Sequence, residues 1–95
     1  MQNLIIDINQ EMMLDANSVG GLLWEIFGAE MTAEPVECAH CGNQDGIGTL
    51  LAFTQGPGVI LRCSTCGKVV LRIVQTPDAI YLDARGAVSL RLARI

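Results

Sequence analysis

The chain has 95 residues, of which 51% are hydrophobic and 17% charged, and its net charge is −4. This length predicts one domain with a single core, and the apolar content excludes general disorder. The first basic residue is Arg62, and no apolar run approaches the roughly 18 residues of a membrane span, so neither a signal peptide nor a membrane segment is expected. These features predict a cytoplasmic protein.

Charge is divided unequally along the chain. Residues 1–47 carry eight acids and no base, whereas residues 48–95 carry six bases and two acids, so the halves sum to −8 and +4. Three arrangements fit this division: the halves pair within one molecule, two molecules pair head to tail, or a basic surface meets an acidic partner.

The first predicted element is a helix over residues 15–28, with Asp15 or Asn17 as its N-cap and Gly28 at the left-handed position that ends it. Trp24 widens the apolar side of this helix, so we expect it to contact more than one neighbour. The preceding tail, residues 1–13, contains "NLIIDIN", which fits either a short strand or the lead-in to a helix. The main apolar stripe of the helix consists of Val19, Leu22, Leu23, Ile26 and Phe27.

Two CxxCG motifs contain all four cysteines and stand 21 residues apart. Four thiolates complete the tetrahedral shell that Zn²⁺ prefers, and a two-residue spacer lets a tight turn direct both sulfurs to one ion. Gly42 and Gly67 follow the pairs and allow the chain to turn past the metal, where backbone N–H groups can support the thiolates. The motifs therefore predict one structural Zn²⁺ bound by Cys38, Cys41, Cys63 and Cys66.

Other interpretations of the cysteines are weaker. Redox-active CxxC pairs normally open a helix, whereas both pairs here precede segments typical of strands. Iron is the more serious alternative, because rubredoxins contain similar CxxCG pairs, although they enclose the iron in an aromatic core. His40, the only histidine, lies between two cysteines, but the four thiolates already complete the shell, so we expect it to face solvent.

Strand patterns follow the first cysteine pair. The turns "GPG" and "TPD" separate apolar segments and predict an antiparallel meander of three to four strands over residues 49–55, 59–63, 68–75 and 79–83. The C-terminal segment 84–95 fits strand alternation and helical spacing, and we favour the helix. The sequence therefore predicts a small α+β fold, with an N-terminal helix packed on a zinc ribbon over residues 36–83.

A resemblance extends over residues 14–92. The stretches "LDAN…GGLLWEIFGAEMT", "CAHCG", "LRCSTCG", "VLRIV" and "YLDARG" resemble a family of small uncharacterised bacterial zinc-ribbon proteins, known as a domain of unknown function. The resemblance implies a bacterial cytoplasmic protein in which a helix is joined to a ribbon. It implies no activity, substrate or partner.

The sequence contains no catalytic motif, and a closed thiolate shell leaves no position for a reactive water, so we expect no enzyme activity. We expect a non-catalytic module that binds a protein partner or a second copy. Nucleic-acid binding through the basic residues is the alternative, disfavoured because the metal centre contributes about −2 to an already negative chain. An iron electron carrier is the third hypothesis. The predicted interaction surface consists of Leu23, Trp24, Phe27, Arg62 and Arg72.

Overall fold

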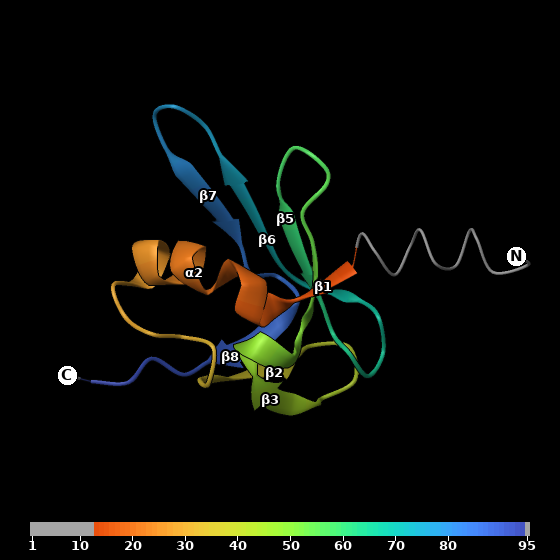
Figure 1. Ribbon diagram of the computed structural model, residues 1–95. Helices are drawn as coiled ribbons and strands as arrows, with labels where there is room; N and C mark the ends of the chain where they lie inside the picture. Colours follow the sequence, from red (N-terminus) through yellow and green to blue (C-terminus); the bar gives the residue numbers. More distant parts are fainter. Residues whose placement is uncertain (1–12, 95) are drawn as a thin grey trace, which may run out of the picture.

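The computed structural model of the protein describes residues 13–94, which form two antiparallel sheets and one α-helix (Figure 1). Residues 1–12 of the predicted tail lie outside the described residues, and Met13 begins the first strand. In chain order the elements are β1 (Met13–Asp15), the 3-10 helix η1 (Ala16–Val19), α2 (Gly20–Phe27), β2 (Pro35–Cys38), β3 (Gln44–Gly46), the 3-10 helix η2 (Ile47–Thr49), β4 (Leu51–Phe53), β5 (Val59–Arg62), β6 (Val69–Gln75), β7 (Ile80–Asp83) and β8 (Ala87–Leu90).

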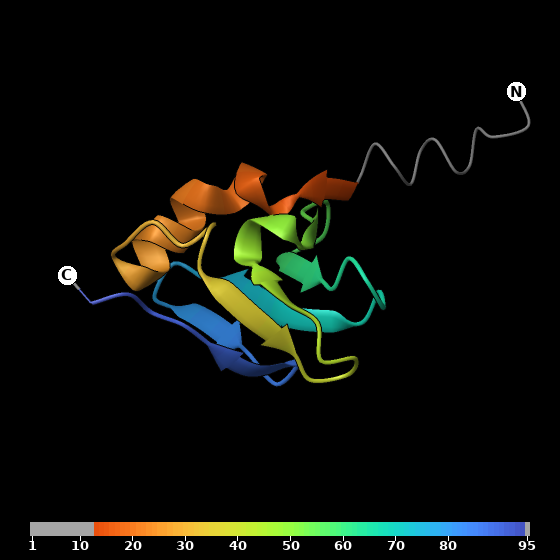
Figure 2. The ribbon, with the colours of Figure 1, turned by 90° about the horizontal axis from the view of Figure 1, so that it is seen from below.

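The larger sheet has the strand order β1-β4-β5-β6-β7. It contains the predicted meander of four strands, and β1 adds a fifth strand beside β4. Ala52, Leu61 and Leu71 are paired across three strands and are fully buried, so they define the inner face of the sheet. Leu23 of α2 belongs to the same core cluster, and Figure 2 shows the helix lying along one side of the strands.

The smaller sheet has the order β3-β2-β8 and was not predicted. It corrects the helix that we favoured within 84–95, because residues 87–90 form a strand that pairs with β2, Val36 lying opposite Leu90. The amide of Ala39 also donates to the carbonyl of Gly86 at 2.8 Å. A strand at this position satisfies backbone groups of β2 that a helix would leave unpaired.

The helix predicted over 15–28 is shorter than expected, because its first turn is the separate 3-10 helix η1. The Asp15 carboxylate accepts a hydrogen bond from the Asn17 amide at 2.9 Å and so caps η1. A 3-10 turn is common at the start of a helix. Gly28 ends α2 in the left-handed conformation, with φ of 72°, as the sequence predicts.

The backbone of Gly86, just before β8 of the smaller sheet, lies close against β6 of the larger sheet. A Cβ atom at Gly86 would lie 2.7 Å from the Cα of Val70 and would overlap the carbonyl oxygen of Val69, so only glycine allows this approach of two backbones. Val70 itself lies at a β-bulge where the register between β5 and β6 shifts. Within residues 13–94, no helix has the length and hydropathy needed to cross a membrane.

Candidate metal centre

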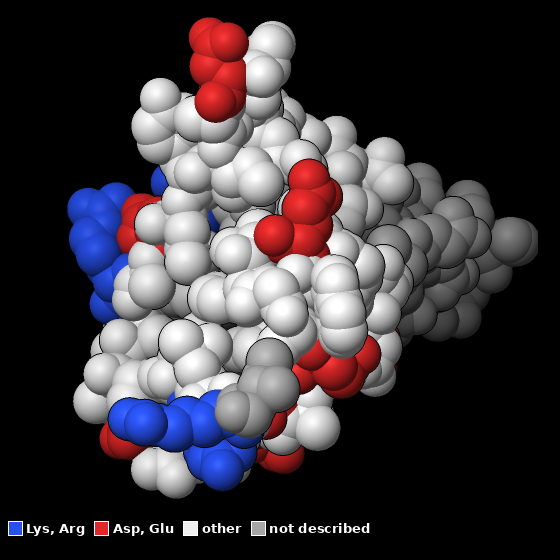
Figure 3. Space-filling view, turned by 90° about the vertical axis from the view of Figure 1, so that its left-hand side faces the viewer, with Lys and Arg blue, Asp and Glu red and all other residues white. Residues whose placement is uncertain are grey.

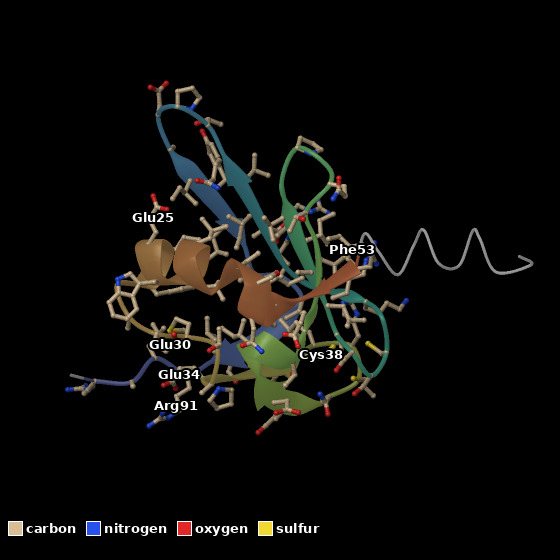
Figure 4. All side chains as sticks on the ribbon, viewed as in Figure 1. Glu25, Glu30, Glu34, Cys38, Phe53 and Arg91 are labelled. Atoms are coloured by element: carbon tan, nitrogen blue, oxygen red, sulfur yellow. The ribbon has the colours of Figure 1, made fainter. Side chains whose placement is uncertain are left out.

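All four cysteines lie together between the two sheets. Cys38 ends β2 and Cys63 directly follows β5, and each CxxC pair forms a turn beyond its strand. The four sulfur atoms lie within 4.8 Å of one another. Figure 4 shows sulfur atoms gathered close to Cys38. The cluster predicted from the motifs is therefore confirmed.

Distances within the cluster fit a tetrahedral shell. The Sγ atoms of Cys38 and Cys66 are 3.7 Å apart, as are those of Cys41 and Cys63. Metal–sulfur bonds of about 2.3 Å in a regular tetrahedron separate the sulfurs by about 3.8 Å. All four cysteines are free rather than bridged. Their donor type and spacing are thus suited to one metal ion with four thiolate ligands.

Each CxxC pair belongs to a six-residue turn, which we call a knuckle: the first knuckle is residues 38–43 and the second is residues 63–68. In the first, the Gly42 amide donates to the carbonyl of Cys38 at 2.9 Å, and in the second the Gly67 amide donates to that of Cys63 at 2.8 Å. The φ angles of the two glycines are 79° and 78°. Nothing lies within 4 Å of a Cβ placed at either glycine, so the positive φ, and not lack of space, favours glycine there.

The amides that reach the sulfurs belong to other residues. The backbone N–H of His40 donates to Cys38 Sγ at 3.4 Å, and that of Thr65 donates to Cys63 Sγ at 3.3 Å. These bonds stabilise negative charge on the two sulfurs. His40 is exposed, as expected, and the metal-ligating cluster found among residues 13–94 does not include it. Its contribution is therefore through its backbone.

The crowded thiols alter one another's ionisation. Burial raises the pKa of Cys63, but backbone N–H groups of Cys66 and Thr65 and the neighbouring thiols outweigh it and lower this pKa to about 7. At Cys41 the backbone hydrogen bond from Asn43 lowers the pKa, but burial and the adjacent sulfurs together raise it to about 12. Four thiolates at these separations repel one another strongly, so a bound cation is what allows all four to ionise.

The centre is shielded on one side. Cys38 and Cys63 are 3% and 1% exposed and belong to the hydrophobic core cluster, whereas Cys41 is exposed and Cys66 is half-buried. The second knuckle has an additional contact: Arg62 donates to the Gly67 carbonyl at 3.1 Å. An ion bound by these four cysteines would therefore connect two buried ligands of the core with two ligands nearer the surface.

Comparison with protein families adds one finding. The model of a family of unknown function, DUF6510, matches residues 9–94. The chain belongs to the DUF6510 family. Comparisons with curated proteins and with solved structures return no match.

In this DUF6510 chain, the predicted interaction surface divides into buried and exposed residues. Leu23 is fully buried and Phe27 packs against the core, so the inclusion of Leu23 in a surface was wrong. Trp24, by contrast, is 56% exposed. The helix turns its stripe of Leu and Phe toward the sheet, and this leaves the indole outside.

The two predicted arginines lie on the outer face of the larger sheet, opposite α2. Arg62 is half-buried, with its guanidinium 5.3 Å from the centre of the Phe53 ring. Arg72 is exposed and lines an open groove of about 430 Å³ together with Phe53, Ile60 and Val74. This groove is mainly apolar and carries no constellation of acid, base and nucleophile.

Sequence reasoning missed the exposed apolar strand β7. Ile80, Tyr81 and Leu82 are 38%, 63% and 39% exposed, and all three lie in succession at the edge of the larger sheet. The signal was the absence of polar alternation in "IYLD", which indicates a strand with apolar side chains on both faces.

Proposed function

We propose that the protein is a zinc ribbon whose single Zn²⁺ is structural, and that it acts as a non-catalytic protein-interaction module. The four-sulfur cluster carries the metal part of this proposal, because its donor set and its 3.7 Å edges suit a closed tetrahedral site. A closed shell leaves no coordination position for a reactive water, so the ion stabilises the fold and does not activate a substrate.

Zinc is favoured over iron by the surroundings of the cluster. The buried hydrophobic residues of the described chain include no aromatic side chain, and Trp24 and Tyr81 are largely exposed. A fully buried aromatic core, such as encloses the iron of a rubredoxin, is therefore not found among the residues that the structure describes. The four protein ligands suit either ion, so metal analysis of the purified protein decides between them.

The interaction part of the proposal rests on exposed apolar side chains. Among residues 15–94, whose burial the structure describes, six large hydrophobic residues are at least 38% exposed. Isolated exposed apolar residues are ordinary, but adjacent ones point to a contact surface. Three of the six are consecutive in β7. The exposed residues are Trp24, Ile80, Tyr81, Leu82, Val88 and Leu92.

Nucleic-acid binding is the second candidate, and the outer face of the larger sheet favours it. Among residues 13–94, the one ion pair that joins the acidic and basic halves is Glu34–Arg91, and Arg85 pairs with Asp83 in its own half. Exposed Arg72 shares a groove with Phe53, which lies two strands away on β4, and Tyr81 lies on the neighbouring strand β7. The negative net charge, made more negative by four thiolates around Zn²⁺, weighs against this candidate.

Metal analysis combined with affinity capture tests the proposal. The purified chain should contain one zinc per molecule and no iron, even when iron is supplied during expression. Zinc-loaded wild type, used as bait at physiological salt, should retain a specific protein that the metal-free Cys63→Ser variant does not retain, and nuclease treatment should leave this capture unchanged. Capture that nuclease abolishes would favour the nucleic-acid candidate, and stoichiometric iron would refute the zinc assignment.

A further inference from the structure

Within residues 13–94, strand β7 is an open edge of the larger sheet. It pairs with β6 on one side, and it is the last strand in the order β1-β4-β5-β6-β7. Natural proteins usually protect such edges with lysine, proline, a bulge or a covering segment, because unpaired backbone groups recruit another strand. The edge residues Ile80, Tyr81 and Leu82 provide none of these protections and are all substantially exposed. Figure 3 views the side on which β7 is the outermost strand in Figure 1, and much of the surface that it shows is uncharged.

The hydrogen-bond pattern identifies which backbone groups face this edge. The Thr76 amide donates to the Ala79 carbonyl at 2.8 Å and closes the turn between β6 and β7. In an antiparallel ladder, hydrogen-bonded and non-bonded pairs then alternate, so Tyr81 and Asp83 bond to β6. The N–H and C=O groups of Ile80 and Leu82 consequently point away from β6, toward the open edge.

We propose that a second copy of the chain pairs with this edge, β7 against β7, in antiparallel register around a twofold axis at Tyr81. The inference rests on the proposed interaction module and names its partner. In this register Ile80 of each copy lies opposite Leu82 of the other, and the outward groups of both residues form four interchain N–H···O bonds. The two five-stranded sheets become one continuous sheet.

The side chains of β7 suit this register. Ile80 and Leu82 lie on the same face of the strand, so the two apolar pairs Ile80–Leu82 stand side by side across the interface. Tyr81 lies on the other face and meets Tyr81 of the second copy at the axis. Pairing of this kind buries apolar surface of Ile80, Tyr81 and Leu82 together, whereas a small polar partner would leave these side chains exposed to solvent.

Charge complementarity favours the antiparallel direction. Asp78 lies in the turn before β7, and Arg85 follows the strand with its side chain 88% exposed. With Tyr81 on the axis, Asp78 of one copy lies opposite Ala84 of the other and therefore beside its Arg85. Arg85 already binds Asp83 through Nε and Nη2, which leaves Nη1 available for a second carboxylate. The twofold axis creates this contact twice.

Tyrosine cross-linking tests the register directly, because Tyr81 is the only tyrosine in the chain. Zinc-loaded full-length protein is irradiated briefly with a ruthenium photo-oxidant and persulfate, and the cross-linked peptide is identified by mass spectrometry. The proposal predicts a dityrosine that joins residue 81 of two chains. In parallel, light scattering over a series of protein concentrations from micromolar to millimolar should show a monomer–dimer equilibrium, since so small an interface is expected to be weak.

Two variants and one control complete the experiment. Leu82→Lys places a charge at each of two symmetric positions and should weaken dimerisation at least about tenfold. Ile80→Pro removes an edge-facing N–H while sparing the bonds to β6, so it should have the same effect without disturbing the fold. Gln55→Lys adds the same charge at an exposed residue between β4 and β5, outside the proposed contact, and should leave the dimer intact. Zinc content verifies that each variant folds.

The outcomes separate this proposal from the proposed function. Dityrosine at residue 81, with dimerisation lost in both edge variants and kept in the control, supports the paired edge. A monomer at every concentration, or a dimer that forms without the cross-link and persists in the edge variants, overturns it. A monomeric wild type that still captures another protein in the affinity experiment would overturn the paired edge alone and leave the interaction module standing.

Discussion

The two knuckles have nearly the same backbone but extend from sheets of very different size. Their glycines differ by 1° in φ, and their amide–sulfur distances differ by 0.1 Å (3.4 and 3.3 Å). The second knuckle extends from the larger sheet, in which Leu61, Leu71 and Ile73 are fully or almost fully buried. The first extends from the smaller sheet, in which Val36 and Cys38 are the buried residues.

This difference indicates what the ion does for the fold. The larger sheet contributes five residues to the core cluster and is covered by α2, whereas the smaller sheet contributes only Val36 and Cys38. A three-stranded sheet with so few buried side chains is marginal without added support. We infer that a metal ion bound to both knuckles attaches the smaller sheet to the larger one and thereby stabilises the smaller sheet.

Removal of the metal should have the largest effect and should be unequal between the sheets. Structural zinc contributes about 10–16 kcal/mol of apparent binding free energy in small domains. On chelation, amides of β2 and β8 should lose protection from hydrogen exchange before those of β5 and β6, because the latter remain packed in the core. Hydrogen exchange measured by NMR on the zinc-loaded and chelated protein checks this order.

A matched pair of cysteine variants separates loss of metal from side effects of the chelator. Cys38→Ser and Cys63→Ser should both abolish metal binding and should reproduce the unequal loss of protection. If protection in both sheets disappears together, the sheets form one cooperative unit, and the smaller one does not depend on the ion in the way inferred from its burial.

Gly86→Ala should produce the next largest effect, because it disturbs the contact between the sheets. The added methyl would overlap the backbone of Val69 and Val70, and forcing atoms into a packed contact of this kind costs about 1–3 kcal/mol. The free energy of unfolding, measured in denaturant with zinc in excess, should fall by this amount. Gly56→Ala is the control. Nothing lies within 4 Å of a Cβ placed at Gly56, so the free energy of unfolding of this variant should stay close to that of wild type. Equal stabilities of the two variants would show that the sheets can move apart at Gly86.

The parts of the structure that the sequence predicted are local ones. Cysteine spacing is sufficient to bring two sulfurs together within one turn, and thiolate chemistry then selects a metal for two such turns. In the same way, Gly28 ends α2 where a left-handed residue is required, and the proline turns mark the meander. Each of these features depends on residues only a few positions apart.

The parts that were not predicted depend on distant partners. Whether residues 87–90 form a strand depends on β2, which lies about half the chain away. The bulge at Val70 buries both Val70 and Leu71, although simple alternation places them on opposite faces. Which of Leu23 and Trp24 is buried depends likewise on where the sheet meets the helix. The hydrophobic pattern of a segment alone does not determine these features, because each depends on the element against which the segment packs.

Substitution of the knuckle glycines should have a moderate effect, equal in the two knuckles. Alanine at Gly42 or Gly67 would have to adopt a φ near +79°, which costs about 1 kcal/mol relative to glycine. Each variant should therefore weaken zinc affinity roughly fivefold in a competition titration with a chromophoric chelator. Asparagine, which enters the left-handed region more easily, should cost less at both positions.

Gly21→Ala is a control with the opposite expected sign. Gly21 is an exposed residue of α2 with open space around its Cβ position, so the alanine variant should be more stable than wild type by about 1 kcal/mol. Unequal costs at Gly42 and Gly67 would show that the sheets strain the knuckles differently, despite their matching geometry.

The smallest expected effect concerns the ion pair that connects the C-terminal tail to the smaller sheet. Arg91 Nη1 lies 2.7 Å from Glu34 Oε1, with side-chain exposures of 65% and 15%, and Figure 4 shows the two residues side by side. Because the Arg91 side chain is largely exposed to solvent, this pair contributes about 1 kcal/mol at most. A double-mutant cycle of Glu34→Gln and Arg91→Met, measured by denaturation at low and high salt, should give a coupling free energy below that value, and the coupling should decrease with salt.

Arg94→Met is the control, because it removes a neighbouring exposed base and should show no coupling to Glu34. Because the hydrogen bond from the Arg91 amide to the Pro35 carbonyl remains in every variant, the tail should stay attached to β2. A large coupling that is insensitive to salt would mean that this pair, and not the metal alone, stabilises the smaller sheet.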